Sequence, residues 1–290
     1  MEKERFQPLH GRRLFINVLV HIFLSILAFI WVIPIIWIVL TSLRAEKGSY
    51  VNTFFPKSYT LENYVKLFTD TSILNFPKMF TNTLIIAIFT CIISTIFVLS
   101  VSYCMSRLRF KFRKTYMNMA MILTLFPGFM SMIAVYYILK AFNLTEGSMI
   151  RVSLILVYSA CSGLGFYIAK GFFDTIPKSL DEAALIDGAT RWQIFTKITI
   201  PLSKPIIIYT VLTSFIGPWV DFIFAKVICR ANQDQYTVAI GLWNMLQKEY
   251  IHSWYTCFAA GAVVVSVPIA ILFVIMQKNY VEGMSGAVKG

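Results

Sequence analysis

The segment SLDEAALIDGATRWQIF, residues 179–195, has the sequence of a water-soluble helical protein. Ser179 and Glu182 have the S-x-x-E spacing of a capping box, in which each side chain satisfies the backbone amide of the other. Helix-forming residues follow, and Gly188 predicts the end of the helix because glycine readily adopts the left-handed conformation of a C-terminal cap. The segment therefore predicts a short, well-defined helix.

A second helix is predicted directly after this glycine. Thr190 and Gln193 can form another capping box. Apolar side chains then recur every third residue, at Trp192, Phe195 and Ile198, and Pro201 predicts the end of the helix. Residues 174–204 are thus expected to form two helices joined by a glycine turn.

The rest of the chain is unlike this polar segment. Of its 290 residues 58% are hydrophobic and only 14% are charged. A run of about 20 apolar residues spans the hydrocarbon core of a membrane. Six such blocks predict six transmembrane helices in an all-α integral membrane protein: 14–43, 83–106, 116–139, 152–173, 205–228 and 255–276.

The distribution of Lys and Arg predicts the orientation in the membrane. With the amino terminus inside, segments 1–13, 107–114, 174–204 and 277–290 hold fifteen Lys and Arg residues, against nine in the outer segments. The positive-inside rule therefore places both termini and the polar segment in the cytoplasm. The net charge of +12 is explained by contact with anionic membrane lipid, and no nucleic-acid partner is expected.

The polar helix pair has two interpretations on the cytoplasmic face. It could lie on the membrane surface as an amphipathic helix, or it could dock on another protein. Surface helices usually carry many Lys and Arg residues. This segment opens instead with Asp181 and Glu182, which favours a protein partner.

No catalytic machinery is visible in the chain. It has no G-x-S-x-G, H-E-x-x-H or phosphate-binding glycine motif, and its five Cys and three His residues are scattered. We expect no catalytic residue, no metal site and no cofactor bound by this chain. Any ATP-driven work requires the nucleotide site of another subunit.

The polar segment resembles a known motif. EAALIDGATRWQIFTKITIPLSKP is similar to the EAA loop of the membrane subunits of bacterial ABC importers, and the tail YVEGMSGAVKG resembles that of the sugar-importer branch, in particular the smaller permeases of maltose and maltodextrin importers. This resemblance implies the type I ABC importer permease fold. It also implies three regions: an amino-terminal segment 1–82, a transmembrane core 83–276 and a cytoplasmic tail 277–290.

The resemblance implies that the steps of transport are carried out by several different subunits. A second permease completes the translocation path, two copies of a cytoplasmic ABC ATPase use ATP and Mg²⁺, and an extracytoplasmic sugar-binding protein delivers the substrate. The chain itself would be a multi-pass subunit of the bacterial cytoplasmic membrane and not an enzyme. ATP hydrolysis would drive the transport path to open alternately to the two sides of the membrane. The transported substrate would be an oligosaccharide such as maltodextrin.

The same resemblance implies which residues touch the ATPase. The contact residues of the coupling loop would be Ser179, Glu182, Ala183, Ala184, Asp187 and Gly188. The tail residues Gly286 and Lys289 would reach between the two ATPase subunits.

A candidate substrate path lies in the fifth block. Gly217-Pro218 predicts a local opening of the helix, and Trp219 and Asp221 follow it. Tryptophan rings stack on sugars, and carboxylates accept hydrogen bonds from hydroxyls, so both residues suit a carbohydrate path. The alternative is a kinked helix in which Asp221 pairs with Lys226 or with a neighbouring span.

Other functions remain open at this point. The permease could serve a type I ABC importer for a solute that is not a sugar. A secondary transporter driven by an ion gradient would need intramembrane acidic residues, and Asp221 alone is thin support for one. An intramembrane enzyme would need paired catalytic groups in the spans, which the sequence lacks.

Overall fold

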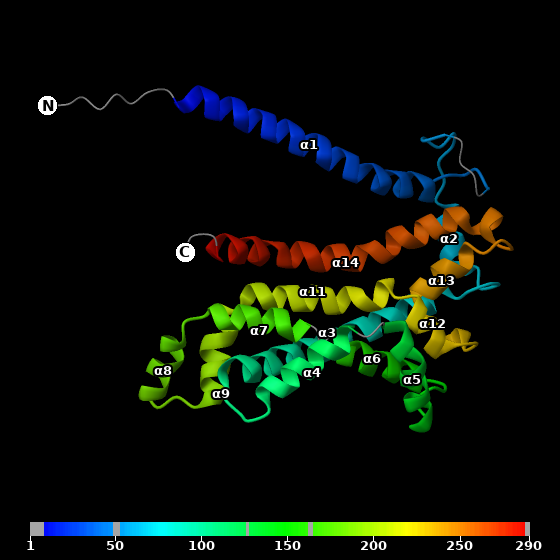
Figure 1. The fold of residues 1–290 in the computed structure, drawn as a ribbon. Coiled ribbons are helices and arrows are strands. Elements are labelled where there is room, and N and C mark those ends of the chain that lie inside the picture. Colours follow the sequence, from blue (N-terminus) through cyan, green and yellow to red (C-terminus); the bar gives the residue numbers. More distant parts are fainter. Residues whose placement is uncertain (1–8, 49–52, 126–127, 162–164, 288–290) are drawn as a thin grey trace.

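The computed structural model describes residues 9–48, 53–125, 128–161 and 165–287, and this part of the chain is almost entirely helical (Figure 1). Its only extended pairing is an isolated bridge between Arg44 and Tyr59. The first seven helices are α1 (Leu9–Ser42), α2 (Glu62–Thr69), α3 (Phe76–Arg107), α4 (Arg113–Leu125), α5 (Gly128–Ala141), α6 (Met149–Cys161) and α7 (Gly165–Thr175). The others are α8 (Lys178–Ile186), α9 (Arg191–Ile194), the π-helix η2 (Phe195–Thr199), α10 (Ile200–Leu202), α11 (Lys204–Val220), α12 (Ile223–Cys229), the 3₁₀-helix η3 (Gln233–Gln235), α13 (Val238–Met245) and α14 (Ile251–Ala287).

Three helices in the described part are each long and apolar enough to cross a membrane alone. They are Leu14–Ser42, Phe76–Arg107 and Ile251–Gln277, and they confirm the first, second and sixth predicted blocks. Two bent helix pairs raise the number to as many as five: α6 with α7, at 40°, and Arg191–Leu202 with α11, at 82°.

The third predicted block, residues 116–139, contains α4 and α5. Residues 126–127, which include Pro127, lie outside the described residues, so the prediction of one continuous helix over this block stays a prediction. The fourth block contains α6 and α7, and the fifth is interrupted after Val220, before α12 begins.

Helix α3 forms the centre of the packing and lies along α11, α6 and α7. Its buried face carries small residues, among them Ala87, Thr90, Ser94 and Ser102, at helical spacing. Within a membrane, small side chains allow helices to approach closely, and van der Waals contact then holds them together. Helix α1, by contrast, packs mainly against α14, and its apolar span exposes nearly all of its side chains (Figure 1).

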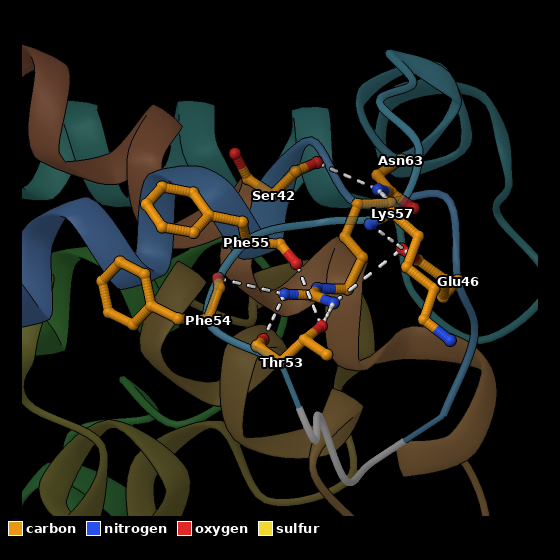
Figure 2. A network of polar contacts seen from close by, with 8 residues as sticks. Ser42, Glu46, Thr53, Phe54, Phe55, Lys57 and Asn63 are labelled. Atoms are coloured by element: carbon orange, nitrogen blue, oxygen red, sulfur yellow. Dashed lines mark hydrogen bonds and ion pairs between the residues drawn. The ribbon is translucent and has the colours of Figure 1, made fainter.

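A polar network ties the carboxyl end of α1 to the loop that follows it (Figure 2). The buried Arg44 guanidinium donates to Thr53 Oγ1 at 3.1 Å, to the Thr53 carbonyl at 2.8 Å and to the Phe54 carbonyl at 3.2 Å. Asn63 of α2 donates to the Ser42 and Arg44 carbonyls at 2.9 and 2.7 Å. The Asn63 bond to Ser42 satisfies a backbone carbonyl that the end of α1 leaves free, and the Arg44 bonds hold the following loop against it.

Different helices lie at the two ends of the molecule. The amino end of α1, the carboxyl end of α14 and the helices α8 and α9 lie at one end, and α2, α12 and α13 lie at the other (Figure 1). We call the first the inner end and the second the outer end. The polar segment therefore lies at the same end of the bundle as the outermost described residues of both termini.

Candidate functional site

Helix α8 begins two residues earlier than the sequence predicts. Its N-cap is Pro177 and no side chain caps it, so Ser179 lies in the first turn and the predicted capping box with Glu182 is wrong. Proline before the first helical residue has its φ already set near the helical value, which replaces the start signal expected from serine. Ser179 and Glu182 are both exposed to solvent.

The predicted end of the helix is confirmed at Gly188, which has a φ of +82°. The Ala189 amide donates to the Ala184 carbonyl at 2.9 Å, and the Gly188 amide donates to the Leu185 carbonyl at 3.1 Å. This pair of bonds is the Schellman motif, which satisfies the free carbonyls at the end of a helix. It holds the tip of α8 in one conformation.

The second helix also begins as predicted. Thr190 Oγ1 accepts from the Gln193 amide, and the Gln193 side chain accepts from the Thr190 amide, so the capping box is present. The helix continues through the π-turn η2 and ends at Leu202, beyond Pro201. The wider π-turn accommodates a proline that would clash with a regular α-helical turn.

The helix pair presents apolar side chains to solvent at its tip. Ile186 is 86% exposed and Trp192 is 70% exposed, and Ala183, Asp187 and Gly188 beside them are exposed as well. Exposed apolar side chains that lie together, rimmed by polar ones, are typical of a protein-docking surface. Of the predicted coupling residues, Ser179, Glu182, Ala183, Asp187 and Gly188 are thus exposed along α8 and its terminal turn, and Ala184 is half-buried.

A buried ion pair anchors α8 to the end of α3. Arg107 Nε lies 3.3 Å from Asp181 Oδ2, and the two side chains are only 2% and 8% exposed. Arg107 Nη2 also donates to the Phe173 and Ile176 carbonyls at 2.9 and 2.8 Å. One arginine therefore fixes the end of α7 and the start of α8 together.

Two aromatic residues attach the second helix to the same place. The Tyr103 hydroxyl donates to the Arg191 carbonyl at 3.3 Å, and its ring lies 4.7 Å from that of Phe195. From the sequence, Arg107 indicated only the orientation of the chain in the membrane, and Asp181 only a negative charge at the start of the polar segment. No local pattern pairs residues so far apart in the chain, so Tyr103 and the partner of Arg107 were missed.

Gly188 can be tested through its conformation alone. A Cβ at this position would meet no atom within 4 Å, so only the positive φ opposes a larger residue. Gly188→Val is expected to cost about 1–2 kcal/mol, the penalty of a left-handed residue. Tryptic cleavage after Arg191 should then be about 5- to 30-fold faster, because the turn opens more often.

Gly188→Asn is the matched control, because asparagine adopts the left-handed conformation more readily than other side chains. It should be cleaved at close to the wild-type rate. Equal cleavage of the Val variant and the wild type would contradict this account of the turn.

A second feature lies inside the helix bundle. A cavity of about 320 Å³ opens among α3, α6, α7 and α11. Hydroxyl-bearing residues dominate its polar lining: Thr90, Tyr158, Tyr209, Thr210, Thr213 and Ser214. Thr90 Oγ1 is buried and has no hydrogen-bond partner among the described residues.

Trp219 and Asp221 do not line this cavity. Trp219 is 2% exposed and packs against Phe80 and Phe215. Asp221 accepts from the Tyr158 hydroxyl of α6 at 2.6 Å and from two backbone amides at the start of α12. The structure therefore supports the alternative reading of Asp221, paired with a neighbouring span and not with Lys226.

The predicted opening of the helix at Gly217-Pro218 is wrong. Helix α11 continues through both residues and ends at Val220. Pro218 is buried within the helix and lines the cavity together with Gly217. Neighbouring helices in a membrane bundle can support a proline inside a helix, which a sequence pattern does not reveal.

The tail is only partly described. Gly286 lies in the last turn of α14, which ends at Ala287. Lys289 lies outside the described residues. Among the described residues no three His, Cys, Asp or Glu side chains gather as metal ligands would.

The fold and these features define a class of protein. It is a helical membrane subunit with a rigid, exposed helix tip at its inner end and a hydroxyl-lined cavity within its spans. Residues 98–286 match the family described as binding-protein-dependent transport system inner membrane component. The chain belongs to this family, and the resemblance seen in the EAA-like segment is confirmed.

Individual relatives agree with this family over nearly the whole chain. The galactooligosaccharides transport system permease protein of Bacillus subtilis (strain 168) is 33% identical over 93% of this chain and 94% of its own length. The maltodextrin transport system permease protein of the same organism is 29% identical over 96% of this chain and 98% of its own. The type I importer fold is supported by the crystal structure of a bacterial ABC transporter that imports alginate, with a TM-score of 0.72 at 22% identity over 93% of this chain and 97% of that one.

Proposed function

We propose that this chain is the permease subunit of an ATP-driven importer of oligosaccharides. The observation that carries the proposal is the exposed, doubly anchored tip of α8 and α9 at the inner end. A permease without a nucleotide site needs such a rigid element to receive motion from an ATPase. The names of its relatives, which are permeases for galactooligosaccharides and for maltodextrin, support a sugar as the transported solute.

The partners follow from the same proposal. Two cytoplasmic ABC ATPase subunits bind and hydrolyse ATP with Mg²⁺, and one of them receives the α8 tip. A second permease completes the path, and an extracytoplasmic binding protein delivers the sugar at the outer end. A related alginate transporter has been solved in complex with a periplasmic protein carrying an alginate pentasaccharide, which supports the last partner.

The membrane arrangement is part of the proposal. Six spans with both termini inside are obtained if α4 and α5 together cross the membrane once and if α6 with α7 does the same. The shared inner end of α1, α14 and α8 supports this orientation (Figure 1). The Arg- and Lys-rich residues 107–114 follow α3 at that end, as the positive-inside rule requires.

The cavity among α3, α6, α7 and α11 supplies the proposed sugar path. Sugars are recognised by hydroxyl and carbonyl groups that exchange hydrogen bonds with their own hydroxyls. The buried Thr90 hydroxyl has no hydrogen-bond partner in the described part of the chain, so a bound sugar can satisfy it. Tyr158 and Tyr209 add aromatic surface at the same cavity.

The proposal is tested by uptake of labelled maltodextrins and galactooligosaccharides in cells with and without this chain. We expect uptake of at least one of these sugars to depend on the chain. Thr90→Val should raise the KM for uptake about two- to tenfold, the worth of one hydrogen bond to a neutral group. Thr95→Val is the matched control, because Thr95 lies on the same helix but does not line the cavity.

Two outcomes would contradict the proposal. If the labelled sugars enter equally well without the chain, while uptake of an amino acid or another solute is lost, the substrate assignment is wrong. If Thr90→Val and Thr95→Val have the same effect, Thr90 does not contact the sugar.

A further inference from the structure

We propose that the inner end of this chain carries a binding site for a phosphate group, at the base of α8. A cavity of about 170 Å³ opens between the end of α3, the start of α4, and the helices α8 and α9. Five basic side chains and two carboxylates line it. The basic residues are Arg107, Arg109, Arg113, Lys178 and Arg191.

Most of this positive charge has no ion-pair partner in the part of the chain that the structure describes. Among the described residues, Arg107 alone of the five forms an ion pair, and its partner is Asp181. Glu182 is the second carboxylate of the cavity and is exposed. Basic side chains gathered around a small space repel one another, so an anion bound among them would be stabilised.

Arg107 provides an independent observation that points to an anion. Its side chain is 2% exposed, yet Nη1 has no hydrogen-bond partner among the described residues. Nη2 is already satisfied by two backbone carbonyls, whereas Nε lies 3.3 Å from Asp181 Oδ2 in the ion pair but, like Nη1, makes no hydrogen bond among the described residues. A buried guanidinium N–H without an acceptor is costly, and an oxygen of a bound anion would remove that cost.

The size of the cavity and its donors indicate phosphate. Pockets for drug-sized ligands are about 300–1,000 Å³, so this one suits a small group and not a sugar chain. Arginine presents several N–H donors in one plane, and this geometry matches the oxygens of phosphate. The anion would bridge α3 and α4 to α8 and α9.

Two sources can supply such a group. Helix α3 is an apolar span that ends at Arg107, so the cavity lies at the level expected for lipid headgroups. An anionic phospholipid of the inner leaflet can therefore insert its phosphate. Free inorganic phosphate from the cytoplasm is the other source. The proposal rests on the cavity itself and does not depend on ATPase docking by α8.

The test uses the detergent-purified transporter that contains this chain. Native mass spectrometry measures binding of phosphatidylglycerol, of a diacylglycerol that lacks phosphate, and of inorganic phosphate. We expect phosphatidylglycerol or inorganic phosphate to bind, and the diacylglycerol not to bind. Arg109→Gln/Arg113→Gln should weaken that binding about tenfold or more, since two charged donors are lost.

Lys111→Gln/Lys114→Gln is the matched control. These lysines lie in the same loop and first turn of α4, are exposed, and do not line the cavity. Their replacement removes the same charge and should change the affinity less than about twofold. If the Arg109→Gln/Arg113→Gln variant loses binding of phosphatidylglycerol alone, the site belongs to a lipid. If it loses binding of inorganic phosphate, the site belongs to the free ion.

Any of three results would overturn the proposal. Equal weakening by both double variants would show only a general attraction of the basic loop for anions. Unchanged binding in the Arg109→Gln/Arg113→Gln variant, or no binding of any phosphate compound to the wild type, would show that the cavity is not a phosphate site.

Discussion

Replacing Arg107 by Met is expected to destabilise the protein by about 3–5 kcal/mol, because it leaves Asp181 buried without its partner. The side chains of the pair are 2% and 8% exposed, so water cannot replace the lost interaction. The variant also loses two hydrogen bonds, which Arg107 donates to the Phe173 carbonyl in α7 and to the Ile176 carbonyl in the turn that follows it. We expect a lower thermal unfolding temperature of the purified complex and a loss of transport.

A reciprocal variant separates the ion pair from simple packing. Arg107→Met/Asp181→Leu removes both charges, and a buried pair replaced by apolar residues is often neutral in stability. The double variant should therefore be more stable than Arg107→Met alone. Lys111→Met serves as the control at an exposed position nearby. An unfolding temperature of Arg107→Met equal to that of the wild type would show that the pair does not anchor α8.

Replacing Ile186 by Lys is expected to separate the ATPase from the permease without unfolding the chain. Ile186 is 86% exposed at the tip of α8, so its substitution removes no contact within the chain. A cation near the carboxyl end of a helix is also favourable for the helix dipole. Under the proposed function, however, this side chain is buried in the ATPase, where an unpaired charge is costly.

The expected loss is that of an interface hot spot, about 2–4 kcal/mol, or about 30- to 1,000-fold in affinity. It is measured by co-purification of the ATPase and by sugar-stimulated ATP hydrolysis in the assembled transporter. Val65→Lys, at an exposed position on α2 at the outer end, should leave both unchanged. Normal co-purification of the ATPase with Ile186→Lys would place the docking surface elsewhere.

Much of the coupling segment could be predicted before the structure was known. Gly188 ends α8 in a left-handed conformation, and Thr190 with Gln193 caps the next helix, as expected. Both features depend on residues that are neighbours in sequence. The start of α8 was predicted less well, because Pro177 takes the place expected for Ser179.

The candidate substrate residues show the opposite case. Trp219 and Asp221 have the right chemistry for a sugar path, yet the structure buries one and pairs the other with Tyr158 of α6. The hydroxyls that do line a cavity come from three helices, and each of these residues, taken alone, is an ordinary polar residue in a span. The type of a residue shows which interactions its side chain can make, but not whether the fold places that side chain against a cavity.

The sequence by itself determined that this is a helical membrane protein with a polar helix pair at one end, since apolar length, loop charge and helix caps all act over a few neighbouring residues. The tertiary structure alone decided that Arg107 meets Asp181, that the fifth apolar block is interrupted after Val220, and that five basic side chains surround one small cavity. These features arise from packing between segments far apart in the chain. Their energies depend on burial and on partners that no local pattern specifies.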